Sequence, residues 1–451
     1  MLQTLINAFK VKEIRHKIYM MLLLLLIFRI GCFIPVPGLD RLQFENAIEG
    51  NDFLTLMSSI TGGALSQGTV FALGIGPYIN ASIIMQLLSV GIPALERLSK
   101  EGEEGRKKIA QYTRYVTILL AVIQSVGIVV GFGQDAIQTH LFFGQTWLAG
   151  LFMAIVYTSG AFIVMWLGER ITDYGVGNGQ SMIIFVGIIA TAGGTIKNKI
   201  IAIFDDVVRA QYWPSSTPSD IVWELVAFIL VAVVIFFAIV YVDLSERKVP
   251  VQYAKQIKGR KMYGGQSSAI PIRISGGGVM PLIFAFSILS FPQMICSLVD
   301  PEGAGWFTKF WSTWMSASIE NPNVEWYHRL VYTLVLCLLI FAFSFFYAQM
   351  QFNPEDVSRS IQQNGGFIHG IRPGKATEAY LKKISNRITL FGAIYLSLVA
   401  FIPSVAFSAA DYTLVNVFST TGILIVVSCA MELDKQLQAQ LMMKNHKGFL
   451  K

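Results

Sequence analysis

Apolar residues fall in long blocks along this chain, separated by polar stretches, and they do not alternate with polar residues as they would in a half-exposed sheet. A helix needs about 20 mostly apolar residues to cross the hydrocarbon core of a bilayer. The pattern therefore predicts an all-α membrane protein with ten transmembrane helices. The predicted spans lie near residues 18–35, 69–92, 113–132, 147–168, 180–196, 221–242, 276–298, 327–349, 385–407 and 412–431.

The composition and the charge distribution support this pattern. Hydrophobic residues make up 54% of the chain, charged residues only 14%, and the mean hydropathy is +0.56. These values are typical of proteins that cross a membrane several times. Most of the 35 Lys and Arg residues gather in alternate loops and near both ends of the chain. By the positive-inside rule, these loops and both termini are predicted to be cytoplasmic.

The ten spans divide into two groups of five, which predicts two halves, residues 1–196 and 197–451. A half with five spans begins on one side of the membrane and ends on the other, so the second half must be inverted. This arrangement is typical of inverted-repeat channels and transporters. Long cytoplasmic loops are expected at about 243–275 and 350–387.

A short Gly-rich segment follows the first span. Residues 53–67 are too short and too polar to cross a bilayer, and Gly74-Ile-Gly-Pro77 interrupts the next apolar block. Irregular backbone at membrane depth is tolerated only where it is buried in protein or lines a water-filled cavity. Residues 53–67 are therefore a surface loop, an interfacial helix or a re-entrant plug. The plug interpretation indicates a conduit.

Charged and metal-ligating residues are scarce within the spans, which bears on the class of function. The chain has five His and no His-Glu-x-x-His motif, so no metal site and no intramembrane proteolysis are expected. Ion-coupled transporters keep acidic or His residues at bilayer depth. Here Arg29 is the only charge well inside a span, and it is close enough to the outer end to snorkel. A passive conduit without a cofactor is favoured over an inverted-repeat secondary transporter of small solutes or an enzyme.

Two Gly-rich stretches resemble nucleotide-binding loops only in part. Residues 175–179, Gly-Val-Gly-Asn-Gly, follow a predicted helix rather than a strand, so a tight turn is expected there, with Ser181 capping the next helix. In residues 370–376 the first Gly is one residue too close to Gly-Lys, and Ala376 replaces the required Ser or Thr. Neither stretch predicts nucleotide binding.

Uncharged polar residues and the basic loops each allow two interpretations. Asn80, Gln124, Gln180 and Ser181 either hold helices together or line a wet seam. The basic residues of the two long loops either fix the topology or dock an acidic or RNA-bearing cytosolic partner.

Several short motifs occur in a fixed order at the ends of the predicted spans. They are FRIG at 28–31, IPVPG at 34–38, GGAL at 62–65, FALGI at 71–75, PYI at 77–79, GRKKIAQYTR at 105–114, WLGE at 166–169, GNG at 177–179, YAK at 253–255, FNP at 352–354 and GIRPG at 370–374. With these motifs the chain resembles the SecY family of bacterial protein-translocation channels over nearly its whole length.

The resemblance implies an hourglass channel of two five-helix halves, with a re-entrant plug helix after the first span and a ring of apolar side chains at mid-membrane. Carried over by motif, the ring consists of Ile75, Ile79, Gln180, Ile184, Ile283 and Ile425. Bulky aliphatic side chains exclude water and ions yet yield around a passing chain. Gln180 departs from the apolar residue that the family has there. Either the plug compensates, or Gln180 turns toward a neighbouring helix and Ile183 takes its place.

The resemblance also implies two movable parts. The plug residues are Phe53, Leu54, Leu56, Met57, Ile60, Gly62, Gly63 and Leu65. The seam between the second, third, seventh and eighth spans is the lateral gate, which opens toward lipid for signal sequences and membrane helices. The gate residues are Asn80, Gln124 and Phe291.

The implied function is that of the central pore-forming subunit, which passes unfolded secretory polypeptides across the bacterial plasma membrane and releases membrane-protein helices into its lipids. The implied partners are the SecE and SecG subunits, the SecA motor ATPase, and the ribosome with its RNA, and the resemblance also brings SecDF and YidC into consideration. The basic loops match the surfaces for SecA and the ribosome. The docking residues are Arg247, Lys248, Lys255, Lys258, Arg260, Lys261, Arg359, Arg372 and Lys375.

Overall fold

Helices make up most of the structure, a computed structural model that describes residues 2–49, 57–58, 61–132, 145–206, 209, 217–253, 256–258, 261–263, 267–274, 277–278, 280–299, 305–315, 326–410 and 420–448. The helices are α1 (Leu2–Lys10), α2 (Lys12–Gly31), α3 (Arg41–Glu49), α5 (Gly76–Gly91), α6 (Pro93–Lys100), α7 (Glu103–Phe132), α8 (Thr146–Tyr174), α9 (Gly179–Phe204), α11 (Pro218–Asp243), α12 (Met280–Val299), α13 (Trp306–Trp314), α14 (Trp326–Gln351), α15 (Pro354–Gln363), α16 (Lys375–Ala410) and α18 (Thr420–Gly448). The strands are β1 (Glu246–Tyr253), β2 (Gln256–Lys258), β3 (Lys261–Tyr263), β4 (Ser267–Arg273) and β5 (Gly366–Phe367).

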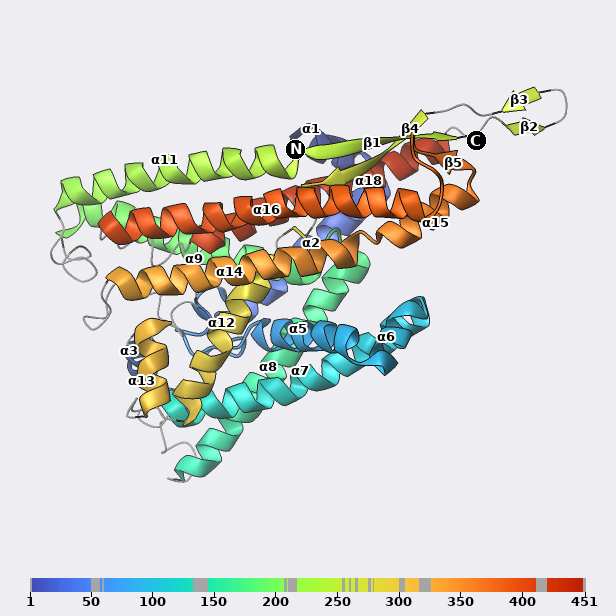
Figure 1. Ribbon diagram of the computed structural model, residues 1–451. Coiled ribbons are helices and arrows are strands. Elements are labelled where there is room, and N and C mark those ends of the chain that lie inside the picture. The colour runs from blue at the N-terminus through green and yellow to red at the C-terminus, as the bar shows by residue number, and fades with distance from the viewer. Residues whose placement is uncertain are drawn as a thin grey trace.

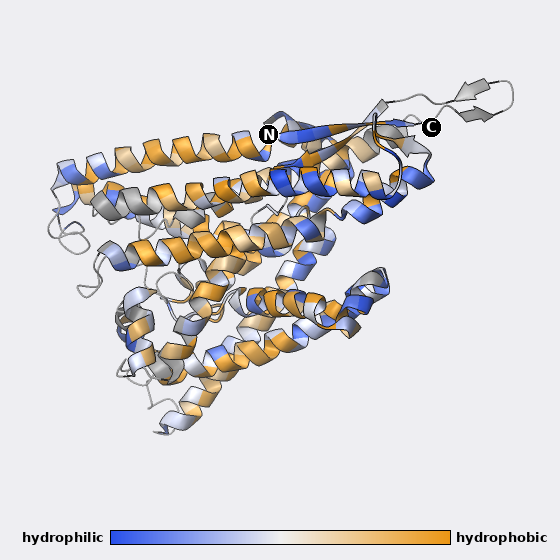
Figure 2. Cartoon of the chain, in the orientation of Figure 1, coloured by the Kyte–Doolittle hydropathy of each residue, from blue (hydrophilic) through white to orange (hydrophobic). Residues whose placement is uncertain are grey.

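The long helices form a bundle whose two ends carry different elements. Figure 1 shows α9, α11, α14 and α16 running in similar directions, with α12 crossing them obliquely. At one end of the bundle lie α6, α15 and the strands β1, β4 and β5, and at the other lie α3 and α13. Hydrophobic residues occupy the middle of the long helices, and hydrophilic residues gather at the end with α6 and α15 (Figure 2).

Each predicted span overlaps one helix of the structure. Within the described residues, six helices are long and apolar enough to cross a membrane, or seven if α5 and α6 count as one span. The bend between α5 and α6 is 104°, and the described apolar part of α12 is shorter, Met280–Leu289. The chain is a helical membrane protein that crosses the bilayer several times.

The interruption that the sequence predicts at Gly74-Ile-Gly-Pro77 is present in the structure. Residues 69–75 form turns, and α5 begins only at Gly76. Gly74 has a φ of +52°, a left-handed conformation that does not continue an α-helix. Pro77 suits the first turn of a helix, where its missing N–H has no intrahelical partner to lose. The helix of the first span also ends earlier than predicted, at Gly31.

The long loop after α11 contains strands that the sequence analysis did not predict. There β1 pairs antiparallel with β4 and with β5, in the order β4-β1-β5, while β2 pairs with β3. Val249 and Val251 of β1 are buried together with Ile361 of α15 and Leu381 of α16. Because alternate residues of a strand point to one face, this face of β1 packs on the helices while its other residues stay exposed. The two long loops therefore form one small platform, β1, β4, β5 and α15, at the end of the bundle.

Candidate functional site

Four helices bring the predicted ring residues together. Ile75 and Ile79 belong to the start of α5, Gln180 and Ile184 to the start of α9, Ile283 to α12 and Ile425 to α18. Helix α5 contacts α12, α12 contacts α18, and α18 contacts α9. A hydrogen bond between the side chains of Tyr78 and Gln180 joins α9 back to α5. The ring residues therefore lie on a closed circuit of helices.

The isoleucines of this circuit share one apolar cluster. Ile75, Ile184, Ile283 and Ile425 are buried, and Ile79 is partly buried against the same cluster. Such side chains attract one another by dispersion, through many weak and non-directional contacts. A constriction built from them has no hydrogen bonds to break when its walls separate.

The turn before α9 fixes the position of Gln180. The Asn178 side chain caps α9 by accepting a hydrogen bond from the Gln180 backbone N–H, at 3.0 Å. The prediction of Ser181 as the cap was wrong, because the helix already begins at Gly179. A Cβ on Gly179 would clash with the carbonyl oxygen of Gly168, so only glycine permits this approach of α9 to α8.

The Gln180 side chain is turned toward neighbouring helices. Its amide group hydrogen-bonds the side chain of Tyr78 on α5. Three side-chain atoms surround the position that a Cβ on Gly168 of α8 would occupy. Gln180 Cγ lies 3.5 Å from that position, Ile75 Cδ1 3.4 Å and Ile183 Cδ1 3.5 Å. Ile183 therefore packs beside Gln180 against α8, and the amide has a partner.

Residues 61–75, which we call the inner loop, pack between α2 and the ring. Of the predicted plug residues, Met57, Gly62, Gly63 and Leu65 are described, whereas Phe53, Leu54, Leu56 and Ile60 lie outside the described residues. Backbone hydrogen bonds run from Val36 N–H to the Gly68 carbonyl and from Val70 N–H to the Ile34 carbonyl, both at 3.0 Å. The chain that follows α2 thus holds one edge of the inner loop, whose Leu65 is buried.

Arg29 of α2 holds the other edge of the inner loop. Its Nη1 donates a hydrogen bond to the Gly62 carbonyl at 2.8 Å, and its guanidinium lies 4.9 Å from the centre of the Phe33 ring. Gly62 has a φ of +74°, and a Cβ there would lie only 3.1 Å from the Gly187 Cα of α9. Arg29 therefore has a hydrogen-bond partner within the protein, a carbonyl of the inner loop.

The predicted gate residues lie on helices that touch one another. Asn80 is on α5, Gln124 on α7 and Phe291 on α12, and these three helices contact each other pairwise. Gln124 is buried, and the other two side chains are partly buried. A polar pair that the sequence pattern did not indicate joins the same seam to α14. There the Tyr347 hydroxyl donates a hydrogen bond to Gln86 Oε1 of α5 at 2.5 Å.

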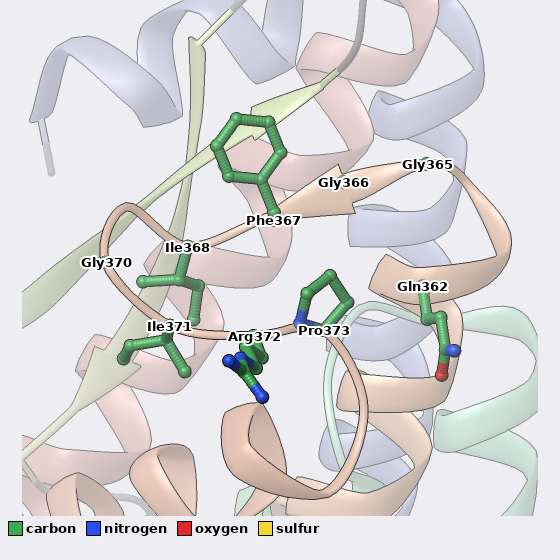
Figure 3. Close-up of a pocket in the computed structure, with 9 residues that line it drawn as sticks. All are labelled: Gln362, Gly365, Gly366, Phe367, Ile368, Gly370, Ile371, Arg372 and Pro373. Atoms are coloured by element: carbon green, nitrogen blue, oxygen red, sulfur yellow. The ribbon is translucent and has the colours of Figure 1, made fainter.

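The platform carries an open pocket of about 640 Å³ around Arg372. It is lined by Gln362, Gly365, Gly366, Phe367, Ile368, Gly370, Ile371, Arg372 and Pro373. Figure 3 shows Arg372 and Phe367 on opposite sides of the loop that leaves β5. Hydrogen bonds from Thr377 Oγ1 to the Arg372 carbonyl and from Ser358 Oγ to the Gly374 carbonyl, both at 2.9 Å, hold this loop against α15 and α16. Its backbone is fixed while the Arg372 side chain is exposed.

The other predicted docking residues divide between described and undescribed parts of the chain. Arg247 and Lys248 are exposed on β1, Arg359 on α15, and Lys375 at the start of α16. Lys258 and Lys261 are paired in the β2–β3 register, and Lys255 and Arg260 lie outside the described residues. Arg359 pairs with Glu355 at 2.7 Å and Lys248 with Glu246 at 3.4 Å. Exposed ion pairs of this kind contribute at most about 1 kcal/mol, so a partner could displace them.

Sites for other chemistry are few in the described part of the chain. No group of three or more His, Cys, Asp or Glu side chains there could hold a metal ion. Cys32, Cys296, Cys337 and Cys429 form no disulfide in the part of the chain that the structure describes.

Comparison with known proteins gives the family. The family model described as SecY matches residues 69–433. The "Protein translocase subunit SecY" of Streptomyces galbus is 37% identical over 461 residues, covering 100% of both chains. The protein of the same name from Halalkalibacterium halodurans is 39% identical over 457 residues, again covering 100% of both. The chain belongs to the SecY family.

Solved structures show that the fold of this SecY-family chain is that of a channel. A structure described as "The structure of a protein conducting channel" matches with a TM-score of 0.66 at 21% identity, covering 94% of this chain and 92% of that one. Another, described as "Sec61 in the Canine ribosome-channel complex from the endoplasmic reticulum", matches with a TM-score of 0.61 at 20% identity and the same coverage. At these identities the likeness concerns the fold.

The SecY-family fold of this chain also contains a buried ion pair that we did not predict. Lys199 of α9 pairs with Glu224 of α11, and their side chains are 1% and 10% exposed. Lys199 lies beyond the predicted span 180–196, but α9 continues to Phe204. Arg29 is therefore not the only charge inside a span. A glutamate within the apolar block 221–242 was the available signal, since such a residue requires a partner.

Proposed function

We propose that this chain is the central pore-forming subunit of a protein translocation channel. It passes unfolded secretory polypeptides across a membrane and releases membrane-protein helices sideways into the lipid. The observation that carries the proposal is the full-length match to relatives named Protein translocase subunit SecY. The family is one of channels rather than enzymes, and the fold of a protein-conducting channel agrees with it.

The proposed constriction is the ring of Ile75, Ile79, Gln180, Ile184, Ile283 and Ile425. The closed circuit of α5, α12, α18 and α9 supports it, as does the shared apolar cluster of the isoleucines. An apolar constriction stops ions by dewetting, and its side chains separate around a polypeptide without leaving a hydrogen-bonding group unpaired. The hydrogen bond to Tyr78 occupies the Gln180 amide, which reduces its attraction for water in the ring.

The proposed plug is the segment 53–67, which continues into the inner loop. Its sequence contains no charged residue, so it can leave a cavity at membrane depth without stranding a charge. The hydrogen bond from Arg29 to the Gly62 carbonyl is the contact that keeps the plug in its seat.

The proposed lateral gate runs between α5, α7, α12 and α14 and includes Asn80, Gln124 and Phe291. The adjacency of these helices supports it.

The platform at the end of the bundle is the proposed docking surface for the SecA motor and for the ribosome with its RNA. Exposed cations at Arg247, Lys248, Arg359, Arg372 and Lys375 would attract acidic protein surfaces and phosphates. A fold match to a ribosome-bound channel supports the ribosome as a partner. SecE and SecG are proposed as companion subunits, and SecDF and YidC as accessory partners.

The proposed location is the bacterial plasma membrane, with both termini and the platform in the cytoplasm. The support is the gathering of Lys and Arg in alternate loops. The proposed halves are residues 1–196 and 197–451. Because α9 continues to Phe204, we propose that the boundary between the halves follows that residue.

The test separates a protein channel from a small-solute transporter. The chain is reconstituted in vesicles with SecE and SecG, and SecA, ATP and a preprotein are added. The expected result is preprotein that becomes protease-protected only when the motor and ATP are present. Uptake of labelled small solutes is measured in the same vesicles. Saturable solute uptake without protected preprotein would contradict the proposal.

A further inference from the structure

Two side chains far apart in the sequence meet in the seam between α5 and α14. The Tyr347 hydroxyl donates a hydrogen bond of 2.5 Å to Gln86 Oε1, and the two residues are 261 positions apart. Tyr347 lies one turn before the end of α14, near the platform. Gln86 lies about 10 Å beyond the ring residue Ile79 along α5, given 1.5 Å per residue. The contact is therefore on the platform side of the ring.

Both side chains are held in place by other contacts. Gln86 Nε2 donates to Ser82 Oγ at 3.2 Å, which orients the amide so that its oxygen faces α14. The Tyr347 ring packs edge-on against Phe284 of α12, with 5.0 Å between the ring centres. A Cβ on Gly277 would lie 3.1 Å from Tyr347 Cβ, so the start of α12 approaches this residue closely. Tyr347 is only 6% exposed, and Gln86 is partly buried.

We propose that the Gln86–Tyr347 hydrogen bond is the latch of the lateral gate on the platform side. Its strength sets how hydrophobic an entering segment must be before the gate opens. The inference rests on the proposed function. It adds two specificity-determining residues on α5 and α14, distinct from the gate residues Asn80, Gln124 and Phe291.

The physical basis is the difference between polar and apolar contacts in the same seam. When α5 and α14 separate around an apolar helix, the Gln86 oxygen and the Tyr347 hydroxyl both lose their partner, and the entering helix offers none. A buried polar group left unpaired is costly. The surrounding contacts of Phe284 with Tyr347 are apolar, and an apolar segment can replace them. An entering segment therefore opens the gate only if the free energy that it gains by leaving water offsets the free energy lost when the Gln86–Tyr347 hydrogen bond breaks.

The latch is tested with a graded series of signal sequences in the reconstituted system described above. In Tyr347→Phe the closed seam contains an unpaired Gln86 oxygen, so the closed state is weakened. Gln86→Leu leaves the Tyr347 hydroxyl unpaired in the same way. We expect each variant to raise the transport of a weakly hydrophobic signal about five-fold, which is the effect of one hydrogen bond. Transport of a strongly hydrophobic signal stays unchanged.

The double variant separates a latch from a general loosening of the fold. With both partners apolar, the closed seam has no unpaired group, so the double variant should shift the threshold less than the two single shifts combined. The matched control is Tyr157→Phe, because the Tyr157 hydroxyl is buried and has no hydrogen-bond partner in the structure. Additive shifts, unchanged thresholds in the single variants, or an equal shift in the control would overturn the latch. Absence of transport by the unmodified chain would instead contradict the proposed function.

Discussion

Cationic side chains are placed differently in two regions of the protein. One region is the ring with its inner loop, and the other is the platform. Near the ring lies the cation of Arg29, whose guanidinium donates a hydrogen bond to the Gly62 carbonyl. On the platform, Arg372 and its basic neighbours are exposed, and their ion pairs are local and weak. In the proposed function, the first region stops charged and polar species while the channel is closed, and the second attracts a partner.

This difference predicts two distinct ways for the channel to fail. Substitutions near the ring should change leakage or signal selection while the motor can still drive transport. Substitutions on the platform should stop driven transport while the closed channel stays tight. Each variant below is therefore measured by both ion leakage and preprotein transport in vesicles.

The largest effect is expected from reversing the charge of Arg372. In Arg372→Glu the exposed side chain repels an acidic partner, while the hydrogen bonds from Thr377 and Ser358 to carbonyls of its loop do not involve the Arg372 side chain and remain. Motor-driven transport should fall by at least about ten-fold, with no change in ion leakage. The matched control is Arg41→Glu, an exposed arginine on α3 at the opposite end of the bundle. Equal transport by the Arg372 variant and the unmodified protein would remove this residue from the docking surface.

The second effect concerns the seat of the plug. Arg29→Leu removes a charge-assisted hydrogen bond to the Gly62 carbonyl, which contributes about 2 kcal/mol. The plug should then leave its seat roughly 30-fold more often, and ion conductance of the resting vesicles should rise. Arg29→Lys keeps a donor and a charge and should give an intermediate leak. If the Leu variant is folded and conducts no more than the unmodified protein, the inner loop does not seal the channel.

A smaller effect is expected within the ring itself. Tyr78→Phe removes the partner of the Gln180 amide, which then attracts water into the constriction. Leakage should rise in this variant and fall again when Gln180→Leu is added, because the ring is then wholly apolar. The comparison is sharpest in the Arg29→Leu background, where the ring has to seal without a seated plug. Identical conductance in the single and double variants would mean that Gln180 does not face the conduit.

The smallest effect concerns stability near the middle of α18. Burial, and then repulsion by Asp243, raises the pKa of Glu432 above its ordinary value, against the attraction of Lys435 and Arg273. A carboxyl whose pKa is raised by folding binds its proton more tightly in the folded state, so stability falls as the pH rises through that pKa. Glu432→Gln should therefore raise Tm at about pH 8, and the gain should vanish near about pH 4. A thermal unfolding series in detergent checks this, and a gain that is constant with pH contradicts the assignment.

The sequence predicted the parts of this fold that depend on local composition. Blocks such as those of α11 and α14 are apolar all round, so their lengths mark helices whatever they pack against. The start of α5 depends on the positive φ of Gly74, and the Gly74-Ile-Gly-Pro77 break in the apolar block indicates it in the sequence. The strand β1 lies in a basic stretch of the sequence. Burial of one of its faces depends on packing against α15 and α16, which are distant in the sequence.

The site residues divide in the same way, into those that local motifs predict and those that depend on contacts between distant parts of the chain. The ring isoleucines were predicted from the family resemblance, through motifs at the ends of the spans. They lie on four adjoining helices. The Tyr78–Gln180 and Gln86–Tyr347 hydrogen bonds each join helices distant in the sequence, so no local pattern could indicate them. The partner of Arg29 was missed because a loop carbonyl has no signature in the sequence.

The most direct test of the central claim asks whether a polypeptide passes through the ring. Photocrosslinking groups are placed at Ile79, Ile283 and Gln180 in separate variants, and a secretory chain is stalled during motor-driven transport. The account predicts that crosslinks to the stalled chain form from these positions. No such crosslinks are expected from Tyr157, which is buried in a different apolar cluster. Crosslinks from the ring positions to lipid alone, with the stalled chain present, would contradict the account.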